Sequence, residues 1–154
     1  MMDVLMHGHK TMAIKINIQP TAEDLAGKSH WWGFPDLPEA CEWPCNEDGD
    51  LLTFICQISL EDISELDSEN RLPHKGMLWF FAELDYFLGD LDAPCGGTGE
   101  WEPGTFKVLY SEDHSDLLTN EYYWEDGEPA VIPAEKMTFE AASETDFGFK
   151  LLGM

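Results

Sequence analysis

The chain has 154 residues, of which 44% are hydrophobic, and its 31 acidic residues outnumber its 8 lysines and arginines to give a net charge of -23. Such a charge repels phosphate backbones and anionic lipid surfaces, so we expect neither nucleic acid nor a membrane as a partner. No apolar run approaches the roughly 20 residues that cross a bilayer, and the first residues lack the pattern of a secretory signal. The sequence therefore predicts a single cytoplasmic domain over residues 1–154, with a disordered start over residues 1–11.

The first third of the chain reads as one strand, one short helical turn and a long ordered loop. Residues 12–18 alternate apolar with polar side chains, which predicts a strand with one buried face. Thr21 is a residue type that caps helices, so we expect a turn of helix through Leu25. Residues 29–44 are rich in Trp, Pro and Gly and predict an ordered extended loop, because so many aromatic side chains need a surface to pack on. Residues 46–50 predict a hairpin turn.

The rest of the chain predicts several more strands and one more helix. Residues 51–59 form a nearly continuous apolar run, which is typical of a central strand buried on both faces. Residues 60–66 have apolar side chains at helical spacing and predict a short amphipathic helix. Further strands are expected over residues 77–84, 105–110 and 137–141, and an edge strand or a packed loop over residues 122–124. This pattern predicts an α+β fold: a mostly antiparallel β-sheet with a few short helices and a Pro/Trp-rich ordered loop.

The patterns that could bind metal or catalyse a reaction are weak. We expect the four cysteines (Cys41, Cys45, Cys56 and Cys95) to be free thiols, because their spacing lacks the two matched pairs of a zinc site. His7 and His9 lie near a chain end, and the glycine-rich residues 96–99 lack the lysine of a phosphate-binding loop. The loop over residues 111–116 mixes Ser, His and Asp within a single short segment, whereas a catalytic triad is assembled in space. We therefore expect no metal, no cofactor and no catalytic residue.

Several short motifs follow one another in a particular order. They are Ser29-His30-Trp31-Trp32-Gly33-Phe34-Pro35-Asp36-Leu37-Pro38, Trp43-Pro44, Gln57-Ile58 and Gly76-Met77-Leu78-Trp79-Phe80-Phe81. This order resembles the YwqG-like family, a bacterial family described mostly as a domain of unknown function. The resemblance covers roughly residues 12–139 and matches the first half of longer relatives, and it implies a fold and little about activity. The chain departs from the family pattern at His30, where Lys is common, and at Trp32, where the first glycine of a pair is common.

The group most like a binding site lies in the Pro/Trp-rich loop and on the strand that follows it. Its members are Ser29, Trp31, Trp32, Phe34, Trp43 and Gln57. Gln57 is polar within an apolar run, so a buried Gln57 needs hydrogen-bond partners. In one interpretation Gln57 ties the loop to the sheet while the aromatic side chains cover the core. In the other, the aromatic side chains line a groove for a peptide or a small ligand.

Three functions remain open at this level. The acidic surface and the aromatic loop favour a non-enzymatic module that binds another protein, most simply a basic one, because charge complementarity speeds association. The alternative is a small-ligand-binding protein or an enzyme with a pocket near Ser29, Trp43 and Gln57. A third hypothesis is a homodimer, in which a second copy replaces the absent second half of longer relatives.

Overall fold

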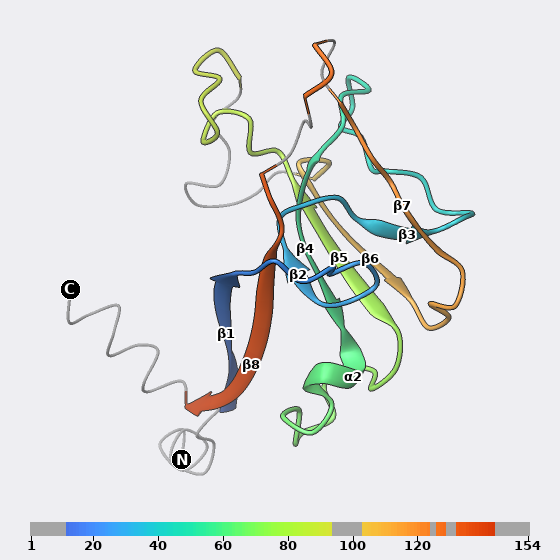
Figure 1. The fold of residues 1–154 in the computed structure, drawn as a ribbon, viewed down its shortest axis with the longest axis vertical. Coiled ribbons are helices and arrows are strands. Elements are labelled where there is room, and N and C mark those ends of the chain that lie inside the picture. The colour runs from blue at the N-terminus through green and yellow to red at the C-terminus, as the bar shows by residue number, and fades with distance from the viewer. Residues whose placement is uncertain (1–11, 94–102, 124–125, 129–131, 144–154) are drawn as a thin grey trace, which may run out of the picture.

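The computed structural model describes residues 12–93, 103–123, 126–128 and 132–143. Two antiparallel sheets account for the strands in these ranges, as Figure 1 shows: a large sheet of order β1-β8-β2-β4-β5-β6 and a small one of β3-β7. The elements are β1 (Met12–Pro20), β2 (His30–Trp31), β3 (Asp36–Pro38), β4 (Thr53–Ser59), α2 (Leu60–Ile63), β5 (Met77–Ala82), β6 (Phe106–Ser111), β7 (Leu117–Thr119) and β8 (Glu135–Ser143). The prediction of a mostly antiparallel sheet is confirmed.

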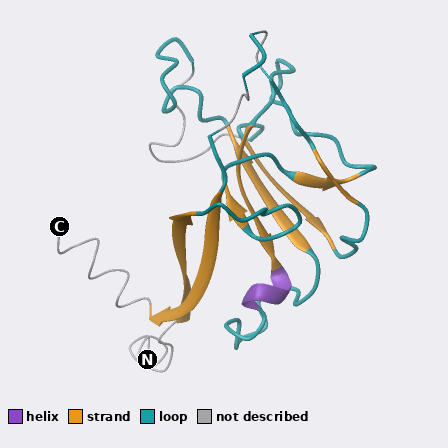
Figure 2. Cartoon of the chain, in the orientation of Figure 1, coloured by secondary structure: helices purple, strands orange, loops and turns teal. Residues whose placement is uncertain are grey.

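The prediction of an α+β fold with a few short helices is not supported. Within the described residues α2 is the one helix, and it has four residues (Figure 2). A single turn gains almost nothing from helix propagation, and its N-cap Ser59 makes no side-chain capping bond, so the expected helix over residues 60–66 ends at Ile63. The helical turn expected at Thr21 is also wrong: the Thr21 hydroxyl accepts a hydrogen bond from the amide of Glu23 and forms a local turn instead.

The two central strands of the large sheet form close to where the sequence predicts them. β4 lies between β2 and β5 in the large sheet, and its consecutive residues Cys56, Gln57 and Ile58 are all buried, so the strand is covered on both faces. β5 pairs with β4 through Ser59↔Met77 and Gln57↔Trp79, which fixes which side chains share a face. The predicted central strand and its neighbour are therefore confirmed, with β5 ending at Ala82 rather than at residue 84.

One face of the large sheet carries the main core. Trp79 and Phe81 of β5 are 0% and 2% exposed, and they pack with Phe54 and with Leu37 of β3. Leu117 of β7 packs against the same cluster, so the small sheet covers this face. Burial of such large side chains is the main term that stabilises a domain of this size.

The opposite face carries a smaller cluster around α2. Leu60 and Ile63 of the helix pack with Cys56, Ile58 and Met137 of the sheet. The described helices and strands place only this single turn of helix over the face.

β1 forms as predicted, but its apolar face is not buried. Ile16 and Ile18 remain 39% and 40% exposed. β1 is an edge strand whose nine residues all pair with β8, while the two residues of β2 join β8 to β4 (Figure 1). The β1–β8 ribbon therefore projects from the rest of the sheet, and its apolar side is left open to solvent. No helix in the described part of the chain is long and apolar enough to span a membrane.

Candidate functional site

A buried hydrogen-bond network ties the Pro/Trp-rich loop to the sheet, with Gln57 at its centre. The Gln57 side chain is 0% exposed, and its oxygen accepts a 2.9 Å hydrogen bond from the backbone amide of Asp36. Its side-chain amide donates to the carbonyl of Lys28 at 2.9 Å and to Oδ2 of Asp36 at 2.7 Å. These contacts fit the first of the two interpretations of Gln57, in which its side chain ties the loop to the sheet.

Asp36, which the sequence did not single out, is the most heavily bonded carboxylate of this network. Its Oδ2 also accepts a 2.8 Å hydrogen bond from the amide of Gly27, and its Oδ1 accepts one from the hydroxyl of Thr119. Burial alone would raise the pKa of Asp36, but the hydrogen bonds from His30, Thr119, Gly27 and Gln57 outweigh it and hold the pKa below its usual value. Asp36 is therefore an ionised group inside the protein.

His30 completes the network from β2. Its Nδ1 lies 2.7 Å from the carbonyl oxygen of Trp32, and a carbonyl can only accept, so Nδ1 carries a proton. Its Nε2 lies 3.5 Å from Oδ2 of Asp36, and both side chains are less than 5% exposed. Both ring nitrogens thus face acceptors, and the ring is held between the Trp32 carbonyl and the buried Asp36 carboxylate. His30 and Asp36 lie in the same Pro/Trp-rich loop, and no periodic pattern in the sequence marked them as partners.

The backbone at Trp32 and Gly33 is left-handed, with φ of 56° and 76°. Gly33 fits because a Cβ there would lie 2.7 Å from the Cβ of Ala134. Trp32 lacks the freedom of glycine, and a left-handed residue with a side chain costs about 1–2 kcal/mol. Hydrogen bonds from both amides, to the carbonyls of Ile55 and Ile132, hold this turn in place.

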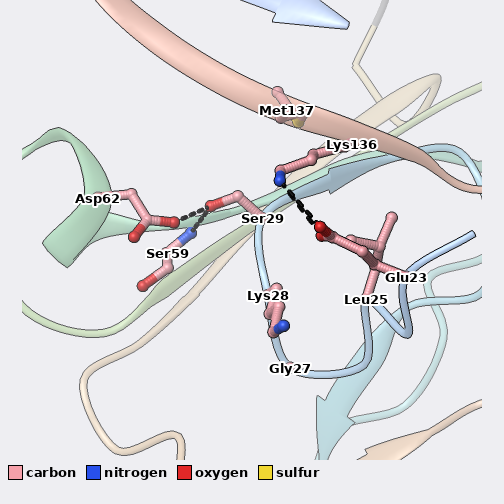
Figure 3. A pocket seen from close by; sticks show the side chains of 9 residues that line it. All are labelled: Glu23, Leu25, Gly27, Lys28, Ser29, Ser59, Asp62, Lys136 and Met137. Carbon is pink, nitrogen blue, oxygen red and sulfur yellow. Dashed lines mark hydrogen bonds and ion pairs between the residues drawn. The ribbon is translucent and has the colours of Figure 1, made fainter. Parts of the chain in front are cut away.

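A pocket of about 380 Å³ opens beside Ser29, between the start of β8 and α2 (Figure 3). The Ser29 hydroxyl donates a 2.7 Å hydrogen bond to Asp62 and accepts a 2.8 Å bond from the amide of Ser59. Across the pocket the Lys136 ammonium lies 3.2 Å from the Glu23 carboxylate. The polar groups in its wall thus already bind one another. Gln57 and Trp43 do not line this pocket, although the sequence grouped them with Ser29.

The aromatic side chains of the predicted site divide between the two faces of the sheet. Trp31 packs with the cluster around α2, and its ring lies 5.6 Å from that of Trp32. Trp43 packs on the main core, on the opposite face, and its indole nitrogen donates a 2.7 Å hydrogen bond to the carbonyl of Leu52. The sequence grouped these residues because they are close in the chain, and the sheet passes between them.

Phe34 and Trp43 instead meet two tyrosines that the sequence left as an edge strand or a loop. The ring of Phe34 lies 5.7 Å from that of Tyr123, and the ring of Trp43 lies 6.5 Å from that of Tyr122. The tyrosines are 44% and 48% exposed. Glu121 accepts a hydrogen bond from the Tyr123 hydroxyl, which raises the pKa of that tyrosine. We call these four rings the aromatic surface.

Two acidic loops meet at one end of the large sheet. The hairpin over residues 46–50 is confirmed by the Cys45↔Leu51 bridge, and the side-chain amide of Asn46 donates a hydrogen bond to the Glu83 carboxylate at the start of the second loop. The second loop, residues 83–93, exposes Phe87, Leu88 and Leu91 among its acids. We call the two loops the acidic end, which lies at the top of Figure 1. Neither loop contains a lysine or an arginine.

The remaining predicted features form no site in the described residues. Cys41, Cys45 and Cys56 are free thiols, and burial raises the pKa of Cys56 to about 12. In the loop over residues 111–116 the Ser111 hydroxyl donates to the carbonyl of Asp113, which closes a local turn. No group of three or more His, Cys, Asp or Glu side chains in the described ranges is arranged to hold a metal. The segments 1–11 and 96–99 and Cys95 lie outside the described residues.

Comparison with known proteins identifies a family without a known activity. Residues 29–150 match the family model described as a domain of unknown function, DUF1963. This range includes His30, Asp36 and Gln57 of the buried network and the whole acidic end. No curated protein matches the chain.

Proposed function

The chain belongs to the DUF1963 family, and from this premise we propose that it is a non-enzymatic module that binds a basic protein through its acidic end. We further propose that it is a YwqG-like bacterial protein of the cytoplasm. The proposal rests on the chemistry of the described surfaces, because the family description assigns no activity.

The observation that carries the proposal is the mixed character of the acidic end. A loop that served solubility alone would expose charge, whereas residues 83–93 also expose Leu91 at 75% and Phe87 at 53%. Apolar side chains surrounded by charges of one sign are typical of protein-binding surfaces, in which the apolar part supplies affinity and the charges supply steering. The acidic side chains around these apolar residues favour a partner whose binding surface is edged by basic residues.

The aromatic surface extends this region. The ring of Trp43 lies 6.0 Å from that of Phe81, and residues 81–83 lead directly into the second acidic loop. Tyr122 lies beside Trp43, so its exposed ring adjoins the same end of the sheet. Tyrosine and tryptophan are the residues that most often anchor protein interfaces.

The alternative function, a ligand-binding protein or an enzyme, has the pocket beside Ser29 in its favour. The groups that would recognise a ligand there, Ser29, Asp62 and Lys136, are engaged in protein contacts, and a ligand would have to break them. Gln57, the other polar residue of the predicted site, is fully buried. We therefore favour protein binding.

The test is a pull-down with the tagged chain and two triple variants. The first variant, Glu47→Gln with Asp48→Asn and Asp50→Asn, removes three charges from the acidic end. The control, Glu65→Gln with Glu112→Gln and Asp116→Asn, removes three exposed charges from the other end of the sheet. Captured proteins are compared by mass spectrometry at about 50 mM and about 500 mM salt, since salt screens surface charge.

We expect the parent and the control to retain a stoichiometric basic protein at low salt, and the first variant and the high-salt wash to lose it. Equal capture by both variants would contradict the assignment to the acidic end. An eluate without a partner in any form would contradict the binding function.

A further inference from the structure

The side of the large sheet that faces α2 is an apolar surface that extends from one edge strand to the other. The register puts Phe80 opposite Val108, so alternate residues of β5 and β6 point to this side. The register of β1 with β8 puts Ile16 opposite Phe139 on the β1–β8 ribbon. Ile14, Trp31 and Phe80 pack on the cluster around α2, which joins the two parts. We call this side the open face.

The open face is exposed to an extent that is unusual for so many apolar side chains. Phe106, Val108 and Tyr110 of β6 are 46 to 47% exposed, and Ile16 and Ile18 of β1 are 39 and 40% exposed. Together with the partly exposed side chains between them they form one apolar surface, and exposed apolar patches of more than a few hundred Å² are rare on single chains and mark interaction sites. The opposite face, by contrast, is covered by β3 and β7.

The strands of the open face are also nearly free of charge on this side, in a chain with a net charge of -23. Among the described strand residues that point to it, Glu135 is the one with a charged side chain. The other side of the β1–β8 ribbon carries Lys15, Lys136 and Glu140. Glu61 and Asp62 lie on α2, where the helix covers one end of this face, and the strand surface beside the helix is almost free of acids.

We propose that the open face packs against the open face of a second copy of this chain, so that two sheets stack as in a β-sandwich. Sheets stacked face to face bury alternate side chains of facing strands, and these are the side chains exposed here. A standard stable interface buries roughly 800 Å² per partner, so the contact would engage the face from β1 to β6 and not one strand alone. This inference is independent of the acidic end, which lies at the loops beyond the strands.

The charge pattern selects a second copy over a basic partner. A basic partner would seek the acids, and the open face offers almost none. Two copies at -23 each repel over the rest of their surfaces, so they can approach only where acids are absent. A two-fold interface places the same patch on each copy, so a patch without acids on one copy faces a patch without acids on the other.

Charge gives the dimer a signature opposite in sign to that of basic-partner binding. Salt screens the repulsion between the two acidic copies, so added salt strengthens self-association, whereas it weakens capture of a basic protein. The failure of one proposal is thus distinguishable from the failure of the other.

The experiment is sedimentation of the full chain at several concentrations, at about 50 mM and about 500 mM salt. We expect a monomer–dimer equilibrium whose dissociation constant falls severalfold at the higher salt. Ile16→Glu and Val108→Glu place a charge on the open face, and each acts twice in a two-fold dimer, so each should weaken it by more than about 100-fold. The matched control is Gln19→Glu, which adds the same charge to β1 on its other side.

Circular dichroism establishes that each variant is folded before its association is measured. A parent chain that stays monomeric at both salts overturns the proposal, whatever the variants do. A dimer that Ile16→Glu and Val108→Glu weaken no more than Gln19→Glu does overturns it as well, because that dimer would use another surface.

Discussion

Removing the charge of Asp36 should destabilise the protein at neutral pH and much less in acid. Four donors converge on this carboxylate: His30, Thr119, Gln57 and the amide of Gly27. In Asp36→Asn the amide oxygen can keep the bonds that Oδ2 accepts, and the Thr119 hydroxyl can turn to accept from the amide nitrogen. What is lost is the charge on the acceptor, since hydrogen bonds to an ionised group are roughly twice as strong as neutral ones.

The expected loss of stability follows from the number of hydrogen bonds that lose a charged acceptor. Three or four charge-assisted bonds each lose about 0.5 to 1 kcal/mol, so we expect the free energy of unfolding to fall by about 2 to 3 kcal/mol at pH 7. The pKa of Asp36 is lowered in the folded state, so its contribution is present above the unfolded-state value of 3.8 and is lost as the pH falls through the folded value. The difference in the free energy of unfolding between parent and variant should therefore become smaller below pH 3.8.

The assay is urea denaturation of parent and variant at pH 7 and at about pH 3, on either side of the sequence pI of about 4.1. Asp113→Asn is the control, because hydrogen bonds from Ser115 also lower the pKa of Asp113 but this carboxylate is exposed, so its removal should change stability little. A variant as stable as the parent at pH 7, or an equal loss at both pH values, would refute the account of the buried network.

Three further predictions concern the loop and the thiols. Gly33→Ala should lower the free energy of unfolding by about 2 kcal/mol in urea denaturation, because its Cβ meets Ala134 and its φ is positive; an unchanged midpoint would contradict this. Trp32→Asn should stay within about 1 kcal/mol of the parent, since asparagine tolerates the left-handed backbone, and a large loss would mean that the indole contacts dominate. Cys56 should resist iodoacetamide at about pH 8 until the chain unfolds, while exposed Cys45 reacts. Mass spectrometry of the labelled peptides measures both reactions. Rapid labelling of Cys56 in the native protein would count against its burial.

The long strands were predictable because their apolar patterns are local. β4 and β5 read directly from the sequence, since a strand buried on both faces needs a continuous apolar run. The short strands were not: β3 exists because Asp36 pairs with Thr119, 83 positions away, and no local pattern encodes such a contact. The same limit hid Asp36 itself, whereas Gln57 was visible as a polar residue within an apolar run.

The burial of β1 was mispredicted for a related reason. Its alternation is genuine, and the side chains of Ile16 and Ile18 do share one side of the ribbon. Alternation shows that one side of a strand is apolar, and what covers that side depends on the rest of the molecule. In this protein the described residues leave it open, and the open face is the result.

Binding of a basic protein by the acidic end is best tested by the salt dependence of partner affinity. For the basic protein captured by the chain, the dissociation constant is measured across a salt series with the parent, with the triple variant over residues 47–50 and with the triple control. If the acidic end binds the partner, affinity should weaken steadily with salt, the dependence should be flatter for the triple variant at the acidic end, and the slope should not change for the control. The same slope for all three proteins would contradict binding at the acidic end.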